Sequence, residues 1–147
     1  MTLITYEDWV WSHPNPALVA NYMLPGTPTY TSERTAIAQL AAKAWHSSPI
    51  PSEIDWVGVT PSPKPEKFVA GRKSGIMRLA STVKYLNIVL NQNAGQFITS
   101  SGRVEERWPA TGRAAFAVSL VRMTGREWRI ATITHLDTSR GLGRIVR

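Results

Sequence analysis

The sequence contains no cysteine, and this absence excludes disulfide bridges, thiolate nucleophiles and cysteine-ligated metal sites. It also lacks any apolar run near the roughly 18 residues that a membrane-spanning helix needs. The first twenty residues include Glu7, Asp8 and Pro14 but no basic start and no apolar segment, so we expect no signal peptide there. The sequence allows three locations for the protein: the cytoplasm, a virion, or the soluble part of an anchored envelope protein.

Histidine is scarce as well, since the chain has only His13, His46 and His135. No His-x-x-x-His or Glu-x-x-His spacing occurs, and such spacings are typical of zinc and di-iron centres. We therefore predict no metal site and no cofactor.

The net charge of +7 is divided unevenly along the chain. Residues 1–66 hold three basic and six acidic residues, whereas residues 67–147 hold fourteen basic and four acidic ones. A basic half can attract nucleic acid, anionic lipid or an acidic partner, but it is also typical of a solvated sheet face. No cluster of five or six consecutive basic residues and no nucleic-acid-binding motif supports a nucleic-acid partner, which is therefore kept only as a hypothesis.

A length of 147 residues fits one domain with a core of its own. We divide it into an N-terminal arm over 1–14, a single domain over 15–137 and a basic, glycine-rich tail over 138–147. The arm, which contains the stretch TYEDWVWSHPNP, is predicted to be irregular or extended. Trp9 and Trp11 would then share one face and could plug the core or contact a partner.

Two helices are predicted after the arm. Asn15-Pro16 is typical of a helix start, because Asn can cap and Pro suits the first position; this helix ends at Pro25-Gly26. The second helix is expected to begin at Thr31 or Ser32 and to end near Ser47. Its apolar positions follow helical spacing: Ile37, Leu40, Ala41 and Ala44.

The rest of the chain has the pattern of strands and loops. Short strands are predicted over 53–59 and 67–71, and one long strand over 76–90, with a turn at 91–95 and a strand over 96–100 that pairs back. Residues 100–112 are predicted to be a loop or irregular edge because of Pro109. The stretch 114–137 alternates with period two on both arms around Gly125, which predicts a hairpin.

The predicted helices come first in the chain, and the predicted strands follow and end in a hairpin. This order predicts an α+β fold, with helices packed on a strongly curved antiparallel sheet. The stretches AFAVSLVRMTGREWRIATI and NPALVANYML…TSERTAIAQLAAKAW resemble the cone-shaped domains of the nuclear transport factor two-like superfamily, over about residues 15–137. This superfamily includes polyketide cyclases, ketosteroid isomerases and scytalone dehydratase. The resemblance implies either a ligand or reaction held in the cone, or a docking domain such as those of conjugation and type IV secretion machines.

The resemblance also implies where a catalytic group would lie if the chain is an enzyme, namely inside the cone. The candidates are His135, Asp55, Tyr85 and Arg129. General acid–base catalysis needs such groups within hydrogen-bond reach of each other or of substrate. No spacing in the sequence forces any two of these residues together, so no catalytic residue is assigned.

Aromatic residues beside arginine are typical of interface anchors. Trp108 follows Arg107 and has Arg113 nearby, so the segment RVEERWPATGR is predicted to be a binding loop. Trp9 and Trp11 in the arm are the other binding candidates.

Three functions follow from these observations. The first is a non-catalytic interaction or assembly domain of a larger machine, with a protein partner or self-assembly; arginine outnumbers lysine twelve to five, which is typical of a high-GC bacterial or phage source. The second is a cyclase- or isomerase-type enzyme or a small-molecule binder that uses the cone pocket. The third is nucleic-acid binding through the basic half.

Overall fold

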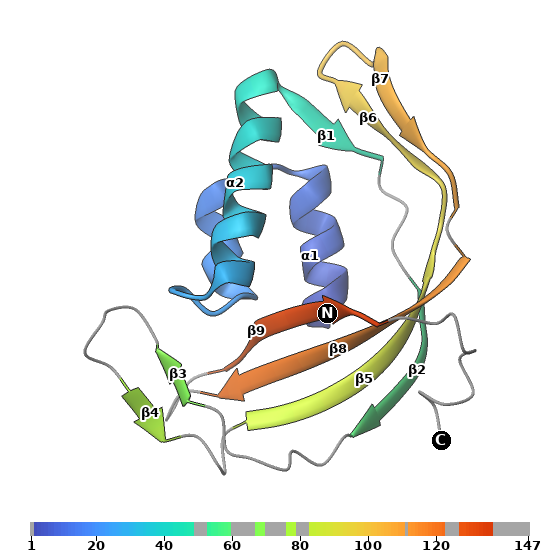
Figure 1. Ribbon diagram of the computed structural model, residues 1–147. Helices are drawn as coiled ribbons and strands as arrows, with labels where there is room; N and C mark the ends of the chain where they lie inside the picture. The colour runs from blue at the N-terminus through green and yellow to red at the C-terminus, as the bar shows by residue number, and fades with distance from the viewer. Residues whose placement is uncertain are drawn as a thin grey trace.

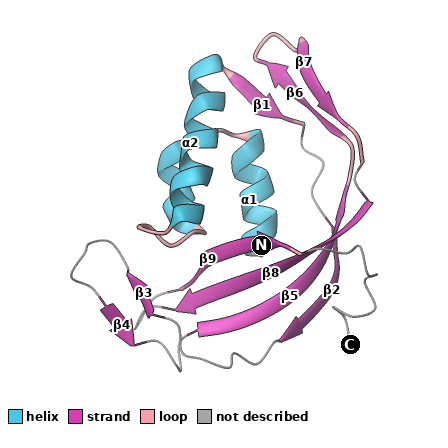
Figure 2. Ribbon diagram, in the orientation of Figure 1, coloured by secondary structure: helices cyan, strands magenta, loops and turns pink. Residues whose placement is uncertain are grey.

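A computed structural model describes residues 2–48, 53–59, 67–69, 76–78, 83–110, 112–122 and 127–136. The order of elements is three helices followed by nine strands (Figures 1 and 2). Their bounds are α1 Leu3–Ser12, η1 Pro16–Asn21, α2 Pro28–Lys43, β1 Trp45–Ser47, β2 Glu53–Val59, β3 Lys67–Val69, β4 Ile76–Arg78, β5 Val83–Gln92, β6 Gly95–Thr99, β7 Val104–Trp108, β8 Gly112–Arg122 and β9 Trp128–His135. The predicted α+β fold is confirmed.

The strands form a four-stranded sheet in the order β2-β5-β8-β9 and a three-stranded sheet in the order β1-β6-β7. All strand pairs within them are antiparallel. Only Asn93 and Ala94 separate β5 from β6, so the chain runs from one sheet directly into the other. Figure 1 shows that the two sheets together bend around α1 and α2.

Three register shifts accompany this bend. They lie between Ile54 and Trp56 in β2, between Phe97 and Ile98 in β6, and between Ser119 and Leu120 in β8. An extra residue in one strand of a pair increases the local twist and bends the strand. The sequence therefore curves its sheets through bulges, which leaves a concave face toward the helices.

The expectation of an irregular or extended arm over residues 1–14 is wrong for Leu3–Ser12, which form α1. The Thr2 side chain caps this helix by accepting a hydrogen bond from the Thr5 amide at 3.2 Å. Val10 is fully buried in the core. Because β-branched and aromatic residues are weak helix formers, packing of Val10 rather than local propensity stabilises this helix.

The helix start predicted at Asn15-Pro16 is confirmed, since Asn15 accepts a hydrogen bond from the Ala17 amide at 3.0 Å. The element is a short 3-10 helix, η1, and it ends at Asn21 rather than at Pro25. The following residues then join the sheet. Ile130 of β9 donates to the Tyr22 carbonyl at 2.7 Å and accepts from the Leu24 amide at 2.8 Å, so residues 22–24 cover the outer edge of β9 at Ile130.

The second predicted helix is α2, but its cap lies four residues earlier than Thr31. Thr27 is the cap, accepting from the Tyr30 amide at 3.2 Å, and Pro28 occupies the first turn. The helix ends at Ala44, which adopts a left-handed conformation with φ 52°. Ile37 and Leu40 are buried as the spacing predicts, whereas Ala41 and Ala44 of the same predicted face are exposed.

The single long strand expected over 76–90 is wrong. Ile76–Arg78 pair with β3 in a separate two-stranded sheet, and only Val83–Gln92 join the large sheet. The strand expected over 96–100 forms as β6, yet it pairs with β1 and β7 instead of folding back on β5. The loop expected over 100–112 contains the edge strand β7, which stops one residue before Pro109.

The closing hairpin is confirmed, because β8 and β9 pair from Phe116↔His135 to Arg122↔Trp128. The predicted turn at Gly125 and the tail over 138–147 lie outside the described residues. The core fills the space between the helices and the concave face, and each aliphatic side chain buried there contributes about 1.5–3 kcal/mol. Its buried members are Val10, Val19, Tyr22, Met23, Ile37, Leu40, Ile88, Leu90, Val118 and Ile130.

Among the described residues, no helix has the length and apolar content to cross a membrane.

Candidate functional site

A cavity of about 480 Å³ lies between α1 and the concave face of the sheets. Its volume is within the range of about 300–1,000 Å³ found for small-molecule sites. The lining comes from α1, from the β1 end and from five other strands: Ile4, Glu7, Asp8, Trp11, Ser47, Ser48, Ile88, Leu90, Gln92, Asn93, Phe97, Glu106, Trp108, Phe116 and Ile133.

One face of α1 forms the first wall. Ile4, Glu7, Asp8 and Trp11 follow the spacing i, i+3, i+4, i+7, which places them on one side of a helix. The same helix buries Val10 in the core. Helix formation in this segment therefore turns both carboxylates and Trp11 toward the cavity.

Aromatic side chains form much of the opposite wall. The ring centroid of Phe97 lies 6.2 Å from that of Trp11 and 4.9 Å from that of Trp108. Phe116 of β8 adds a fourth ring. The cavity is thus faced by aromatic surfaces from three elements of the sheets and from α1.

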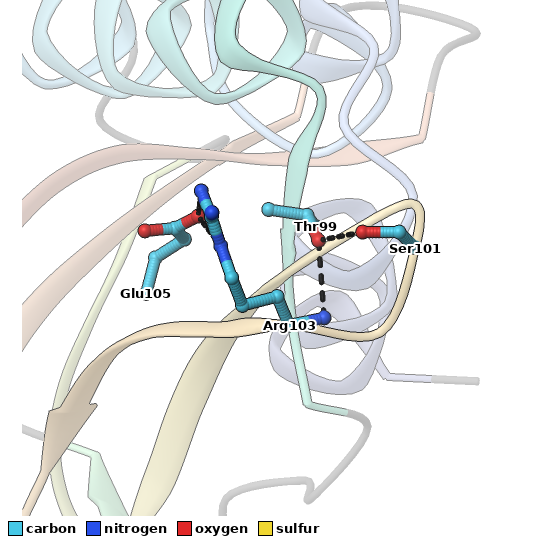
Figure 3. A network of polar contacts seen from close by, with 4 residues as sticks. All are labelled: Thr99, Ser101, Arg103 and Glu105. Atoms are coloured by element: carbon cyan, nitrogen blue, oxygen red, sulfur yellow. Dashed lines mark hydrogen bonds and ion pairs between the residues drawn. The ribbon is translucent and has the colours of Figure 1, made fainter.

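The β6–β7 hairpin, which carries Phe97 and Trp108, is held by a small polar network (Figure 3). The Thr99 hydroxyl lies 2.9 Å from that of Ser101 and accepts from the Arg103 amide at 3.1 Å. The Arg103 guanidinium forms an ion pair with Glu105. Gly102 has φ 86°, a conformation that favours glycine, so the tight connection depends on it.

The charged groups of the lining all have one sign. Glu7, Asp8 and Glu106 line the cavity, and no lysine, arginine or histidine is among its lining residues in the described part of the chain. Glu106 is exposed on the edge strand β7, whereas Glu7 is partly buried on α1. The cavity therefore has an acidic rim and an acidic interior.

Burial, together with the neighbouring Glu33 and Asp8 carboxyl groups, raises the pKa of Glu7 to about 8. Protein surrounds the carboxyl group closely although the residue as a whole is only half-buried. The Glu7 carboxyl makes no hydrogen bond or ion pair with another side chain of the described residues. It is accordingly protonated at neutral pH in the unliganded protein.

Glu33 of α2 lies behind this wall and is hydrogen-bonded. One of its oxygens, Oε1, accepts from Trp11 Nε1 at 2.7 Å and from the Tyr22 hydroxyl at 2.8 Å. Burial raises the pKa of Glu33, and the two hydrogen bonds oppose that rise. Burial and the nearby Glu33 raise the pKa of Tyr22 above its usual range. Glu33 thus positions the Trp11 ring at the cavity wall.

The four residues expected in a cone pocket do not come together. The exposed His135 meets the edge of the Phe116 ring, with centroids 5.2 Å apart, but it does not line the cavity. Asp55 is exposed and pairs with Arg113, with 2.5 Å between Oδ2 and Nε. Tyr85 lies on the face of β5 opposite Ile88.

Arg129, the fourth, is structural. Its Nε donates to the Ala20 carbonyl at 2.9 Å and thereby ties η1 to β9.

The predicted binding residues divide into two groups. Trp11 and Trp108 line the cavity, so the expectation that Trp108 lies in an irregular loop is wrong. Trp9 is 39% exposed and stacks on His13 with centroids 4.6 Å apart. Trp9 and Trp11 do not share a face, because positions two apart on a helix lie on different sides.

The arginines of that segment lie elsewhere. Arg107 and Arg113 are both exposed, and neither lines the cavity.

The sequence analysis missed Glu7, Asp8, Glu33 and Glu106 as site residues. A helical interpretation of the first segment would have found the first two, because their spacing with Ile4 and Trp11 is that of one helix face. The side chains of Glu106 and Arg107 lie on opposite faces of strand β7. The prediction of a loop over this segment gave no such alternation and therefore did not indicate Glu106. Within the described residues, no group of three or more acidic or histidine side chains could hold a metal ion.

No family model matches the chain, and no curated protein matches it. Among solved structures, the chain is similar to the intermembrane space region of chloroplast protein ARC6. The TM-score is 0.50, with 6% sequence identity, over 90% of this chain and 87% of that chain. At this identity the likeness shows the fold alone.

Proposed function

We propose that this chain is a small-molecule-binding domain that receives its ligand in the cavity between α1 and the concave face. The single observation that carries the proposal is the cavity of about 480 Å³, which is lined by four aromatic rings and three carboxyl-bearing side chains. Binding sites combine apolar and aromatic walls with a few polar groups in this way. The proposal makes the chain a cone-pocket member of the nuclear transport factor two-like type.

Binding is proposed rather than catalysis. General acid–base catalysis needs positioned proton donors and acceptors, and His135, Asp55 and Tyr85 all lie outside the lining. Glu7 could exchange a proton near neutral pH, but no second titrating partner is hydrogen-bonded to it in the described part of the chain.

The test is a screen of small soluble fragments by ligand-observed NMR, with tryptophan fluorescence as a second signal from Trp11 and Trp108. The variant Ile133→Trp adds a large side chain to the cavity wall. The control Thr134→Trp adds it at the next, exposed position of β9. Hits that Ile133→Trp abolishes and Thr134→Trp retains support the proposal; hits that survive both variants contradict it.

Protein docking is a second candidate, and exposed apolar residues on β2 favour it. Ile54 is 41% exposed and Val57 is 49% exposed, and β2 is an edge strand of the large sheet. An open edge can pair with a strand of another chain. Size-exclusion chromatography with light scattering tests this: an oligomer or complex that Val57→Lys dissociates supports docking, and a strict monomer without captured partner argues against it.

A further inference from the structure

We infer that the ligand of this cavity is an organic cation, an ammonium group carried on an apolar or aromatic body. The inference rests on the proposed function and specifies its ligand class.

The first observation is that the titratable side chains of the described lining are all acidic. The whole chain has 17 basic and 10 acidic residues, yet three acidic residues and no basic one line the cavity in the described residues. Glu33, a fourth acidic residue, accepts a hydrogen bond from the indole N–H of Trp11. Acidic side chains in the lining of a cavity disfavour an anionic ligand and favour a cationic one.

The aromatic walls fit the same ligand. The faces of tryptophan, tyrosine and phenylalanine attract a cation within about 6 Å of the ring centroid, and the attraction increases when the cation is desolvated. The ring of Phe97 is a neighbour of both tryptophan rings, with its centroid 6.2 Å from that of Trp11 and 4.9 Å from that of Trp108. An ammonium group in the cavity would contact these faces and the carboxylates together.

A metal ion does not fit equally well. Metal ions need three or more oxygen or nitrogen ligands within about 2–2.6 Å, and no such group of side chains is found among the described residues. The cavity of about 480 Å³ is also far larger than a single ion requires. Separated carboxylates around a large aromatic space match a bulky organic cation instead.

Glu7 makes the affinity for a cationic ligand depend on pH. The titratable groups that face it are Asp8 on α1, Glu33 on α2, Tyr22 after η1 and Glu106 across the cavity on β7. These neighbours are acidic, so they disfavour the Glu7 carboxylate until a cation arrives. Binding of a cation therefore releases a proton from Glu7, and affinity increases with pH until Glu7 is already ionised.

The experiment uses three probes of the same shape and different charge, titrated into the full chain by tryptophan fluorescence and calorimetry. They are benzyltrimethylammonium, its neutral isostere neopentylbenzene, and the anion phenylmethanesulfonate. The expected result is that the cation binds at least about tenfold more tightly than the isostere, which corresponds to about 1.4 kcal/mol. The anion should not bind measurably.

Two variants and a control test which side chains cause the preference for the cation. Glu106→Gln should weaken the cation several-fold and leave the isostere unchanged. Glu105→Gln, one residue earlier and paired with Arg103 outside the lining, should change neither probe. Because the cation has no titrating group, its affinity should rise between about pH 6 and 8 in the wild type and stay flat in Glu7→Gln.

The outcomes separate this inference from the proposed function. If cation and isostere bind equally and Glu106→Gln has no effect, the cavity binds small molecules but the charge preference is wrong. If neither the probes nor any fragment binds, the proposed function fails and the inference fails with it. Tight binding of the anion overturns the inference directly.

Discussion

The indole ring of Trp108 occupies the space where a side chain of Gly95, its registered partner across the β6–β7 pair, would begin. A β-carbon added at Gly95 would lie 2.2 Å from Trp108 Cζ2. Glycine is therefore required at this position for the ring to form the cavity wall.

Gly95→Ala should displace the Trp108 ring and destabilise the protein by about 1–3 kcal/mol, as overpacking does. Urea unfolding measures the loss, and the Trp108 fluorescence should change in the native baseline. Gln96→Ala is the matched control, because its registered partner is the exposed Arg107. Equal stability of Gly95→Ala and wild type would contradict this packing.

The pair of hydrogen bonds on Glu33 provides a second prediction. Tyr22→Phe removes the hydroxyl that donates to Glu33 at 2.8 Å and leaves only the Trp11 donor. Hydrogen bonds to charged groups contribute about 1.5–3 kcal/mol, so a loss of that order is expected in thermal or urea unfolding. Tyr30→Phe on the same helix as Glu33 should cost much less, because no side-chain hydrogen bond of Tyr30 is found in the described part of the chain. Similar losses in both variants would show that the hydroxyl does not matter.

A third prediction compares two arginines. Arg129 is mostly buried and donates to the Ala20 carbonyl, whereas Arg113 forms an exposed pair with Asp55. Arg129→Met should reduce the free energy of unfolding by about 1.5–3 kcal/mol. Arg113→Met should reduce it by less than about 1 kcal/mol, as exposed pairs contribute little. The reverse order of these two losses would contradict the assigned roles.

The raised pKa of Glu7 predicts how stability depends on pH. Its folded-state pKa of about 8 lies above the ordinary value of 4.5, so folding favours the protonated carboxyl. The corresponding stability is complete below about pH 4.5 and is lost as pH rises toward 8. Glu7→Gln should remove this loss and be more stable than wild type at about pH 9, by roughly 2–4 kcal/mol.

Chemical unfolding at several pH values measures this dependence. Glu105→Gln is the control and should retain the wild-type profile. A Glu7→Gln variant with an unchanged profile would place the Glu7 carboxyl in solvent.

The patterns that sequence analysis interpreted correctly are local. The final hairpin repeats every two residues, and Ile37 and Leu40 repeat at helical spacing, so each pattern states which face is buried. Long-range pairing sets the register and the curvature of the strands that lie beside the hairpin. The sequence of one strand does not indicate which other strand pairs with it.

The failures share one physical cause, which is dependence on distant contacts. The segment Leu3–Ser12 becomes a helix because its apolar side is buried against residues far along the chain. The strand β6 belongs to the three-stranded sheet although β5, just before it in the chain, belongs to the four-stranded one, so the partners of β6 lie before residue 48 and after residue 103. The acidic cavity is created by these two features together, and for this reason no local motif predicted Glu7, Asp8 and Glu106.

The cover over the outer edge of β9 has a consequence for self-association. Residues 22–24 occupy the hydrogen-bonding groups of Ile130 on that side, whereas β2 forms the opposite boundary of the same sheet. A strand of another copy therefore cannot pair with β9 at Ile130. Pairing through β2 of two copies would accordingly yield a dimer in which the two large sheets form one continuous sheet.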